Sequence, residues 1–197
     1  MYAYVSGTIT LKTPTMVVIE SGGVGYELQI SLYTYGKIEQ LKQVKLWTQL
    51  IVREDSHTLF GFHDPEERVL FNYLISVSGI GPNTARLILS GMSPADVESA
   101  ILTEDEISFK RVKGVGPKTA KRLIIDLKDK LIRAGAGILT IPARPDNTAR
   151  SEALSALIAL GYPSAQAQKA IAGLNARMKD NDDTESWVKA ALQELVG

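Results

Sequence analysis

The sequence contains no cysteine. This absence excludes disulfides and cysteine-based metal or nucleophile sites, and it fits a reducing compartment. An excess of charge of one sign is also lacking, because 22 Lys and Arg residues balance 22 Asp and Glu residues. The total charge therefore gives no reason to expect a polyanionic partner, although a balanced total can conceal a local basic patch.

Long apolar runs and an export signal are missing too. No stretch approaches the roughly 18 apolar residues of a membrane-spanning helix, and MYAYVSGTIT lacks the basic start and apolar run of a signal peptide. The two histidines, His57 and His63, have strand spacing, but without a third partner they are typical of packing or surface residues rather than of a metal site. We expect a cytoplasmic protein with no membrane partner.

Short segments rich in β-branched and aromatic residues fill the first part of the chain, up to His63. They predict three strands, with a hairpin turn at Gly22 and Gly23, then a weakly helical segment, TYGKIEQL, and two more strands, VKLWTQLIV and HTLFGFH. This element order is that of a five-stranded barrel of the oligonucleotide-binding (OB) type. We expect Trp47 to fill the barrel.

Helical periodicity follows from Asp64 onward. Asp-Pro-Glu-Glu offers a helix N-cap, a proline at the first helical position and a glutamate three residues after the cap. Four or five short helices should follow, then a linker rich in glycine and proline, then three helices with Ser164 as a cap and Trp187 in their core. The predicted fold is α+β multidomain, with an OB-type barrel (1–64), an all-α domain (65–134), a linker (135–147) and a three-helix domain (148–197).

The all-α section is the basic part of the chain. Residues 65–134 hold 11 Lys and Arg against 9 Asp and Glu, and residues 110–122 hold six basic residues and no acid. Such a cluster favours an anionic ligand at this place, although the whole chain is neutral.

A repeated phrase lies in the same section. SGIGPNTARLIL (78–89) and KGVGPKTAKRLI (113–124) share both glycines, the proline, the threonine and the alanine. In each copy the first glycine permits a backbone conformation closed to other residues, and the second lets a ligand approach. Proline and threonine then open a helix whose free N–H groups suit a phosphate oxygen. The predicted phosphate-binding residues are Gly79, Gly81, Asn83, Thr84 and Arg86, together with Gly114, Gly116, Lys118, Thr119, Lys121 and Arg122.

Other readings of these turns are weaker. A mononucleotide loop needs glycines where this chain has Val112 and Pro117, and a dinucleotide fingerprint needs a third glycine and a preceding strand. Purely structural corners between helices stay open as an alternative. Two anion sites in one small domain match two phosphates of a nucleic acid, which predicts little sequence preference and a strong dependence on salt.

Several segments together resemble a known family. They are GGVGYE (22–27), VREDSHTLFGF (52–62), SGIGPNTARLILSGMS (78–93), KGVGPKTAKRLIIDLKDKL (113–131) and ALGY (159–162). The paired glycine turns resemble tandem helix-hairpin-helix domains, and the whole chain resembles the RuvA family of Holliday-junction-binding subunits. Asn83 departs from the family, in which lysine is common at this position, and the first strand lacks the usual basic residues.

The resemblance implies a non-catalytic role in DNA recombination, repair and the SOS response. A homotetramer, alone or as two tetramers, would hold four-way junction DNA open and flat. Residues 148–197 would bind a RuvB-type hexameric ATPase, and a junction resolvase is a further partner to consider. This chain would bind no cofactor itself, since ATP and Mg are used by the partner motor.

The resemblance also singles out Glu54 and Asp55, which fall at a hairpin tip. Similar proteins place such a pair at the junction centre, where carboxylates repel phosphates and disfavour continuous duplex. Without the resemblance, these residues are ordinary solvated turn residues. Three alternatives remain open. The first is a structure-specific nuclease, for which Asp64 or Glu66 would have to join the acidic pair at a metal site. The others are a generic DNA-repair binding module that uses the helix-hairpin-helix domain, and a protein scaffold whose barrel contacts no DNA.

Overall fold

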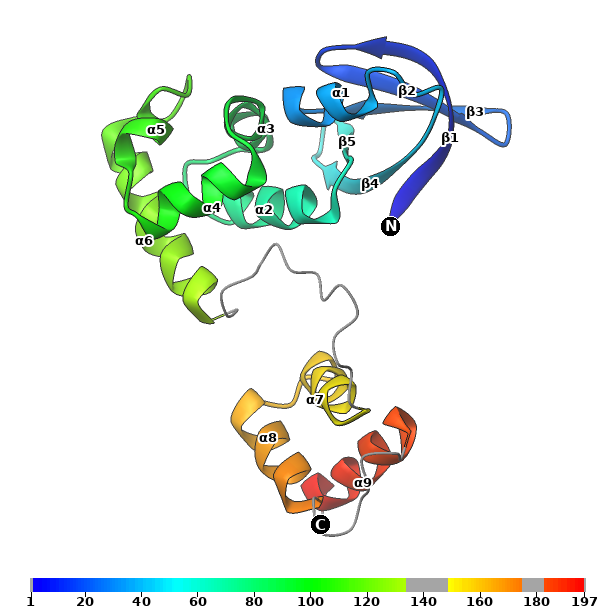
Figure 1. Cartoon of the computed structure of the whole chain (residues 1–197), viewed down its shortest axis with the longest axis vertical. Coiled ribbons are helices and arrows are strands. Elements are labelled where there is room, and N and C mark those ends of the chain that lie inside the picture. Colours follow the sequence, from blue (N-terminus) through cyan, green and yellow to red (C-terminus); the bar gives the residue numbers. More distant parts are fainter. Residues whose placement is uncertain (1, 134–148, 175–182, 197) are drawn as a thin grey trace. The chain divides into compact units, whose positions relative to one another are not determined.

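The computed structural model describes residues 2–133, 149–174 and 183–196 (Figure 1). The chain divides into two compact units, Met1–Ile141 and Pro142–Gly197. The predicted linker, 135–147, lies outside the described residues. The predicted division between residues 64 and 65 falls inside the first unit and stays a prediction.

Five strands form a closed barrel at the start of the chain. They are β1 (Tyr4–Thr13), β2 (Met16–Ser21), β3 (Val24–Gln29), β4 (Gln43–Val52) and β5 (His57–Phe62). Their order around the barrel is β1-β2-β3-β5-β4, and every pair is antiparallel except β3 with β5. Helix α1 (Leu32–Ile38) follows β3. The predicted OB-type barrel is thus confirmed, and Gly22 and Gly23 make the predicted turn with φ of 60° and 80°.

The barrel presents one outer face to the helices. Val17, Ile19 and Leu28 belong to its own core, whereas Phe60 and Phe62 of β5 lie against Phe71, with ring centroids 4.9 and 5.0 Å apart. Phe71 belongs to α2 (Pro65–Ile75), which packs on β4 and β5. Such burial of apolar surface is the main force that holds the helices to the barrel.

The expectation that Trp47 fills the barrel is wrong. Its side chain is half-buried on the outer face of β4, packed against the core of the helical section. Tyr4 meets its ring edge-on at 6.1 Å, and the side chains of Lys45 and Arg68 lie over its face. Alternation along β4 sends Leu46 inward and its neighbour outward, so Trp47 covers the joint between strand and helix.

Four more helices follow in the described part of the first unit: α3 (Pro82–Gly91), α4 (Pro94–Leu102), α5 (Glu106–Lys110) and α6 (Pro117–Arg133). Apart from α5, each helix from α2 to α6 begins with proline, whose fixed φ and missing N–H suit a first helical position. Their inward faces share one apolar core with β5. The predicted short helices are therefore present, and the tight turns between them position the candidate site.

The second unit contains α7 (Ala149–Ala159), α8 (Ser164–Gly173) and α9 (Thr184–Val196). Trp187 is 1% exposed in its core, as predicted. The expected cap at Ser164 is wrong, because Pro163 occupies the N-cap position and Ser164 is already helical. Among the described residues, no helix is long and apolar enough to cross a membrane.

Candidate nucleic-acid interface

The repeated phrase folds into the same turn twice. Gly79 and Gly114 both have a φ of 93°, a conformation that glycine adopts without strain. In the first copy the amide of Ala85 donates to the Gly81 carbonyl at 2.9 Å, and in the second the amide of Ala120 donates to the Gly116 carbonyl at 2.9 Å. The two copies therefore share their backbone geometry as well as much of their amino-acid sequence.

Each turn presents unpaired amides at a helix start. The first backbone bonds of α3 and α6 come from Ala85 and Ala120, so the amides of the two residues that follow each proline have no hydrogen-bond acceptor among the described residues. No acidic side chain lies in the first turn of either helix. These N–H groups sit at the positive end of the helix dipole, which is where a phosphate oxygen binds well.

The second glycine of each turn leaves open space. A Cβ atom added at Gly81 or Gly116 would meet no atom within 4 Å, and Gly81 has an ordinary φ of −85°. The fold itself therefore does not demand glycine there. A ligand that approaches the backbone closely does require glycine at this position, because a side chain would stand between the ligand and the free amides.

Two substitutions in one turn should separate folding from ligand binding. Gly79→Ala forces a side chain into a positive-φ conformation, so we expect thermal unfolding to show a loss of about 1–2 kcal/mol. Gly81→Ser adds a good N-cap and should leave stability unchanged or slightly higher. Its hydroxymethyl group should nevertheless weaken phosphate binding in a gel-shift titration. Equal binding by Gly81→Ser and the wild type would argue that the space is not used.

The two turns lie against each other. The Thr119 side chain is 3.8 Å from the position of a Cβ at Gly79, and the Thr84 hydroxyl is 3.6 Å from that at Gly114. Each threonine thus packs beside the first glycine of the other copy. We predicted both threonines as phosphate ligands; their placement adds a packing role that holds the two helix starts together.

Arg86 is not at the phosphate-binding turn. Its Nη1 donates to the Thr15 carbonyl at 2.9 Å and to Gln29 Oε1 at 3.3 Å, so the side chain fastens α3 to the barrel. Partial burial of the guanidinium lowers its pKa. We therefore withdraw Arg86 from the predicted phosphate ligands. Its partners lie far away in sequence, and no local pattern could have revealed them.

Positive charge gathers at the second turn. The exposed side chains of Lys113, Lys118, Lys121 and Arg122 have no ion-pair partner among the described residues. Lys110, counted in the same cluster, is paired with Glu106 at 2.7 Å. Asn83 takes the corresponding place on α3, so the first turn offers backbone amides without a cation of its own. The two turns share one geometry but differ in charge.

Glu54 and Asp55 lie at the tip between β4 and β5, where the pattern placed them. The Arg53 amide donates to the Ser56 carbonyl at 2.8 Å, and the Ser56 hydroxyl donates to Asp55 Oδ1 at 3.2 Å. Both acidic side chains are exposed, and neither has an ion-pair partner among the described residues. The tip therefore presents two negative charges to its surroundings.

The carboxylates named for a metal-dependent nuclease do not converge. Asp64 Oδ2 accepts from the Tyr33 hydroxyl at 2.8 Å, and its Oδ1 lies 2.7 Å from His63 Nδ1. Burial would raise the pKa of Asp64, but these two hydrogen bonds outweigh it and lower the pKa. No group of three His, Asp or Glu residues able to hold a metal occurs among the described residues.

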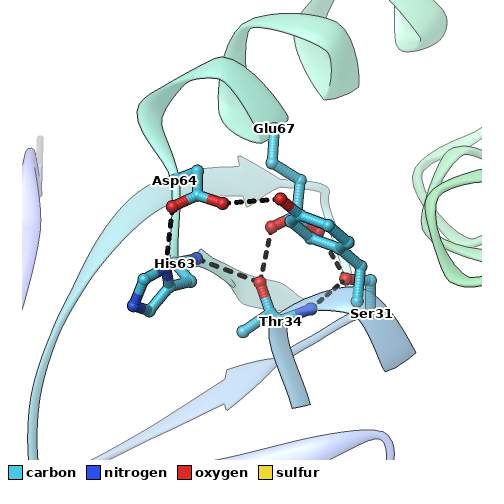
Figure 2. Close-up of polar contacts among 6 residues, drawn as sticks. Ser31, Thr34, His63, Asp64 and Glu67 are labelled. Carbon is cyan, nitrogen blue, oxygen red and sulfur yellow. Dashed lines mark hydrogen bonds and ion pairs between the residues drawn. The ribbon is translucent and has the colours of Figure 1, made fainter. Parts of the chain in front are cut away.

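A buried polar cluster joins α1, the end of β5 and α2 (Figure 2). Glu67 is fully buried and accepts hydrogen bonds from the hydroxyls of Ser31 and Thr34, the latter at 2.5 Å. Thr34 in turn accepts from the His63 amide at 3.0 Å. Burial raises the pKa of Glu67 to about 7 despite the two hydroxyl donors. The sequence led us to expect a helix-capping role for Glu67; instead it links the barrel to the helices.

Matches to three protein-family models together cover most of the chain. The RuvA N terminal domain matches residues 1–61, the SAM-like helix-hairpin-helix tandem matches residues 71–129, and the RuvA C-terminal domain matches residues 148–196. The second match spans both glycine turns. The three matches follow the order of the barrel, the helical section and the second unit.

Curated relatives align over nearly their full length. "Holliday junction branch migration complex subunit RuvA" of Christiangramia forsetii is 44% identical, with 99% of this chain and 100% of the relative covered. Proteins of the same name from Cytophaga hutchinsonii and Flavobacterium psychrophilum are 42% and 43% identical, with 98% and 99% of this chain covered and 99% and 100% of the relatives.

Proposed function

Because the chain belongs to the RuvA family, we propose that it binds four-way DNA junctions in the cytoplasm, as the non-catalytic DNA-binding subunit of a branch-migration complex. The names of its relatives support binding to a junction and membership of a complex. The geometry of the turns supports the mode of binding, which is contact with the DNA backbone and not with base edges.

One observation carries the proposal: two turns of the same backbone geometry lie side by side with unpaired amides and open glycine positions. A single phosphate would need one such turn. Two fixed turns suit two phosphates of one DNA duplex, and Lys118 and Lys121 add charge at the second. Since backbone phosphates are the same in every sequence, binding should be independent of sequence and should fall steeply with salt.

The assembly forms a further part of the proposal. Four copies would surround the junction with Glu54 and Asp55 of each at its centre, and one or two such tetramers would bind. Residues 148–197 would dock a RuvB-type hexameric ATPase, which uses ATP and Mg, whereas this chain would need no cofactor. A junction resolvase would share the same DNA.

A gel-shift titration tests the core of the proposal. Four-way junction and linear duplex of equal length are compared in Mg at two salt concentrations, and the mass of the complex is measured by light scattering. We expect strong preference for the junction and a mass of four or eight chains. Equal binding of both DNAs, or a monomer, would reject the proposal; cleavage of the junction by the protein alone with Mg would favour the nuclease.

The acidic tip should control selectivity. Glu54→Gln combined with Asp55→Asn removes repulsion worth about 1 kcal/mol per close charge pair in water, so we expect linear duplex to bind roughly tenfold more tightly. Junction binding should stay equal or strengthen, and the preference should shrink. The matched control, Glu20→Gln with Glu39→Gln, removes the same charge from exposed positions on β2 and at the end of α1. Unchanged selectivity in the tip variant would leave Glu54 and Asp55 as turn residues.

A further inference from the structure

A groove of ≈ 520 Å³ separates the start of α3 from the stem of the β4–β5 hairpin. Pro82 and Asn83 form one wall, and Arg53, Ser56 and His57 form the other. One wall is therefore the first glycine turn's helix, and the other carries Glu54 and Asp55 at its end. The groove therefore has residues of the first turn and residues next to the acidic tip in its lining.

The size and lining of the groove suit a flat polar molecule. Its volume falls within the range of about 300–1,000 Å³ typical of small-ligand sites. Side-chain amides of Gln29 and Asn83 and the carboxylate of Glu27 supply donors and acceptors, and Leu59 and Phe60 add apolar surface. The Glu27 carboxylate disfavours a phosphate inside the groove but can accept from an amino group.

Two planar side chains stand exposed on the hairpin wall. They are the guanidinium of Arg53 and the imidazole of His57, and neither has a side-chain hydrogen bond or ion pair among the described residues. Planar groups of these types stack on unpaired bases in many nucleic-acid-binding proteins, irrespective of the base. The wall that leads to the acidic tip thus offers stacking surface without reading a sequence.

Arg86 forms part of the groove wall on the side of α3. Its Nη1 donates to the Thr15 carbonyl and to Gln29 Oε1, and its Nε is closed to solvent. A molecule in the groove therefore has to be held by the exposed planar groups of the hairpin wall and not by Arg86.

We propose that the groove receives an unpaired nucleobase from the crossover of a four-way junction, stacked on His57 and Arg53. The inference rests on the proposed junction binding and deepens it. Repulsion at Glu54 and Asp55 keeps duplex away from the tip, and the groove beside it holds a base that has lost its pair. Capture of that base keeps the crossover open while the phosphates stay on the glycine turns.

Photocrosslinking of the full-length protein tests the inference. 5-Iododeoxyuridine is placed at the crossover of a four-way junction, or about ten base pairs along one arm, and the irradiated complex is mapped by mass spectrometry. We expect the crossover base to crosslink to groove residues between Ile51 and Phe60 or at Asn83, and the arm base not to do so. His57→Ala should lower the yield about fivefold or more, since stacking carries much of the capture.

Controls separate this inference from junction binding itself. His57 is exposed, so His57→Ala should keep the fold, and its affinity for the junction is read by gel shift on the same samples. Tyr2→Ala removes another exposed ring, 49% exposed and outside the groove, and should leave the yield unchanged. Crosslinks confined to sites outside the groove, or yields unaffected by both His57→Ala and Arg53→Ala, would overturn the inference while junction binding stands. Loss of junction preference in the wild type would instead reject the proposed function.

Discussion

Replacing Lys118 and Lys121 together by alanine is expected to weaken junction binding at least tenfold at physiological salt. Both side chains are exposed near the start of α6, and neither has an ion-pair partner among the described residues. Each phosphate that a lysine neutralises releases counterions and contributes about 0.9 to the slope of log K against log salt. The slope should therefore fall by about 2 for each subunit in contact with DNA.

The measurement is a salt series of binding titrations with junction and with linear duplex. Both DNAs should lose affinity by a similar factor, because phosphate contacts carry no sequence information and little shape information. Lys42→Ala with Lys169→Ala makes the same charge change at exposed positions that belong to neither turn. If that control lost as much affinity as the Lys118 and Lys121 variant, net charge and not the second turn would explain the binding.

Glu67→Gln is expected to make the first unit more stable than the wild type at pH 8 but not at pH 4. The Glu67 pKa is about 7 in the folded chain against an ordinary value of 4.5, because burial disfavours its charged form. Between pH 4.5 and 7 the Glu67 carboxyl is mostly ionised in the unfolded chain and mostly protonated in the folded chain, so the unfolded chain binds fewer protons. The free energy of unfolding of the wild type should then fall as pH rises from 4.5 to 7 and level off above 7.

The expected loss across that window is about 3 kcal/mol, relative to a variant that cannot ionise there. The amide introduced by Glu67→Gln keeps one oxygen that can accept from one of the two hydroxyls of Ser31 and Thr34, and its NH2 group can donate to the oxygen of the other. Urea unfolding at several pH values, followed by Trp47 fluorescence in a Trp187→Phe background, reports on the first unit alone, since Trp187 belongs to the second. A constant difference between the Glu67→Gln and wild-type curves across pH would show that Glu67 does not titrate in this window.

Local patterns predicted most of the architecture. Proline at Pro65, Pro82 and Pro117 indicated where helices begin, and short β-branched and aromatic segments with paired glycines indicated the barrel. These signals act within a few residues, so they can be read without knowing the fold. The positive φ of Gly79 and Gly114 follows from the same local logic.

Long-range contacts account for what was missed. The sequence predicts that Trp47 is an apolar core residue. Whether it packs in the barrel core or against the helical core depends on where α2 packs. Arg86 lies within the repeated phrase, yet its acceptors come from the barrel, more than fifty residues earlier. Glu67 has the spacing of a capping residue and is instead drawn to hydroxyls of α1. The groove likewise joins segments that only the folded chain brings together.

The reciprocal contacts of Thr84 and Thr119 fix the spacing between the two glycine turns. Each threonine is seated beside the opposite glycine, so the gap between the two helix starts is set by van der Waals packing, which salt does not screen. Salt can lower the affinity of the two turns for DNA but cannot change the distance between them. On the proposed function, a DNA backbone whose phosphates match that distance is bound by both turns at once, and a distorted backbone is bound by only one.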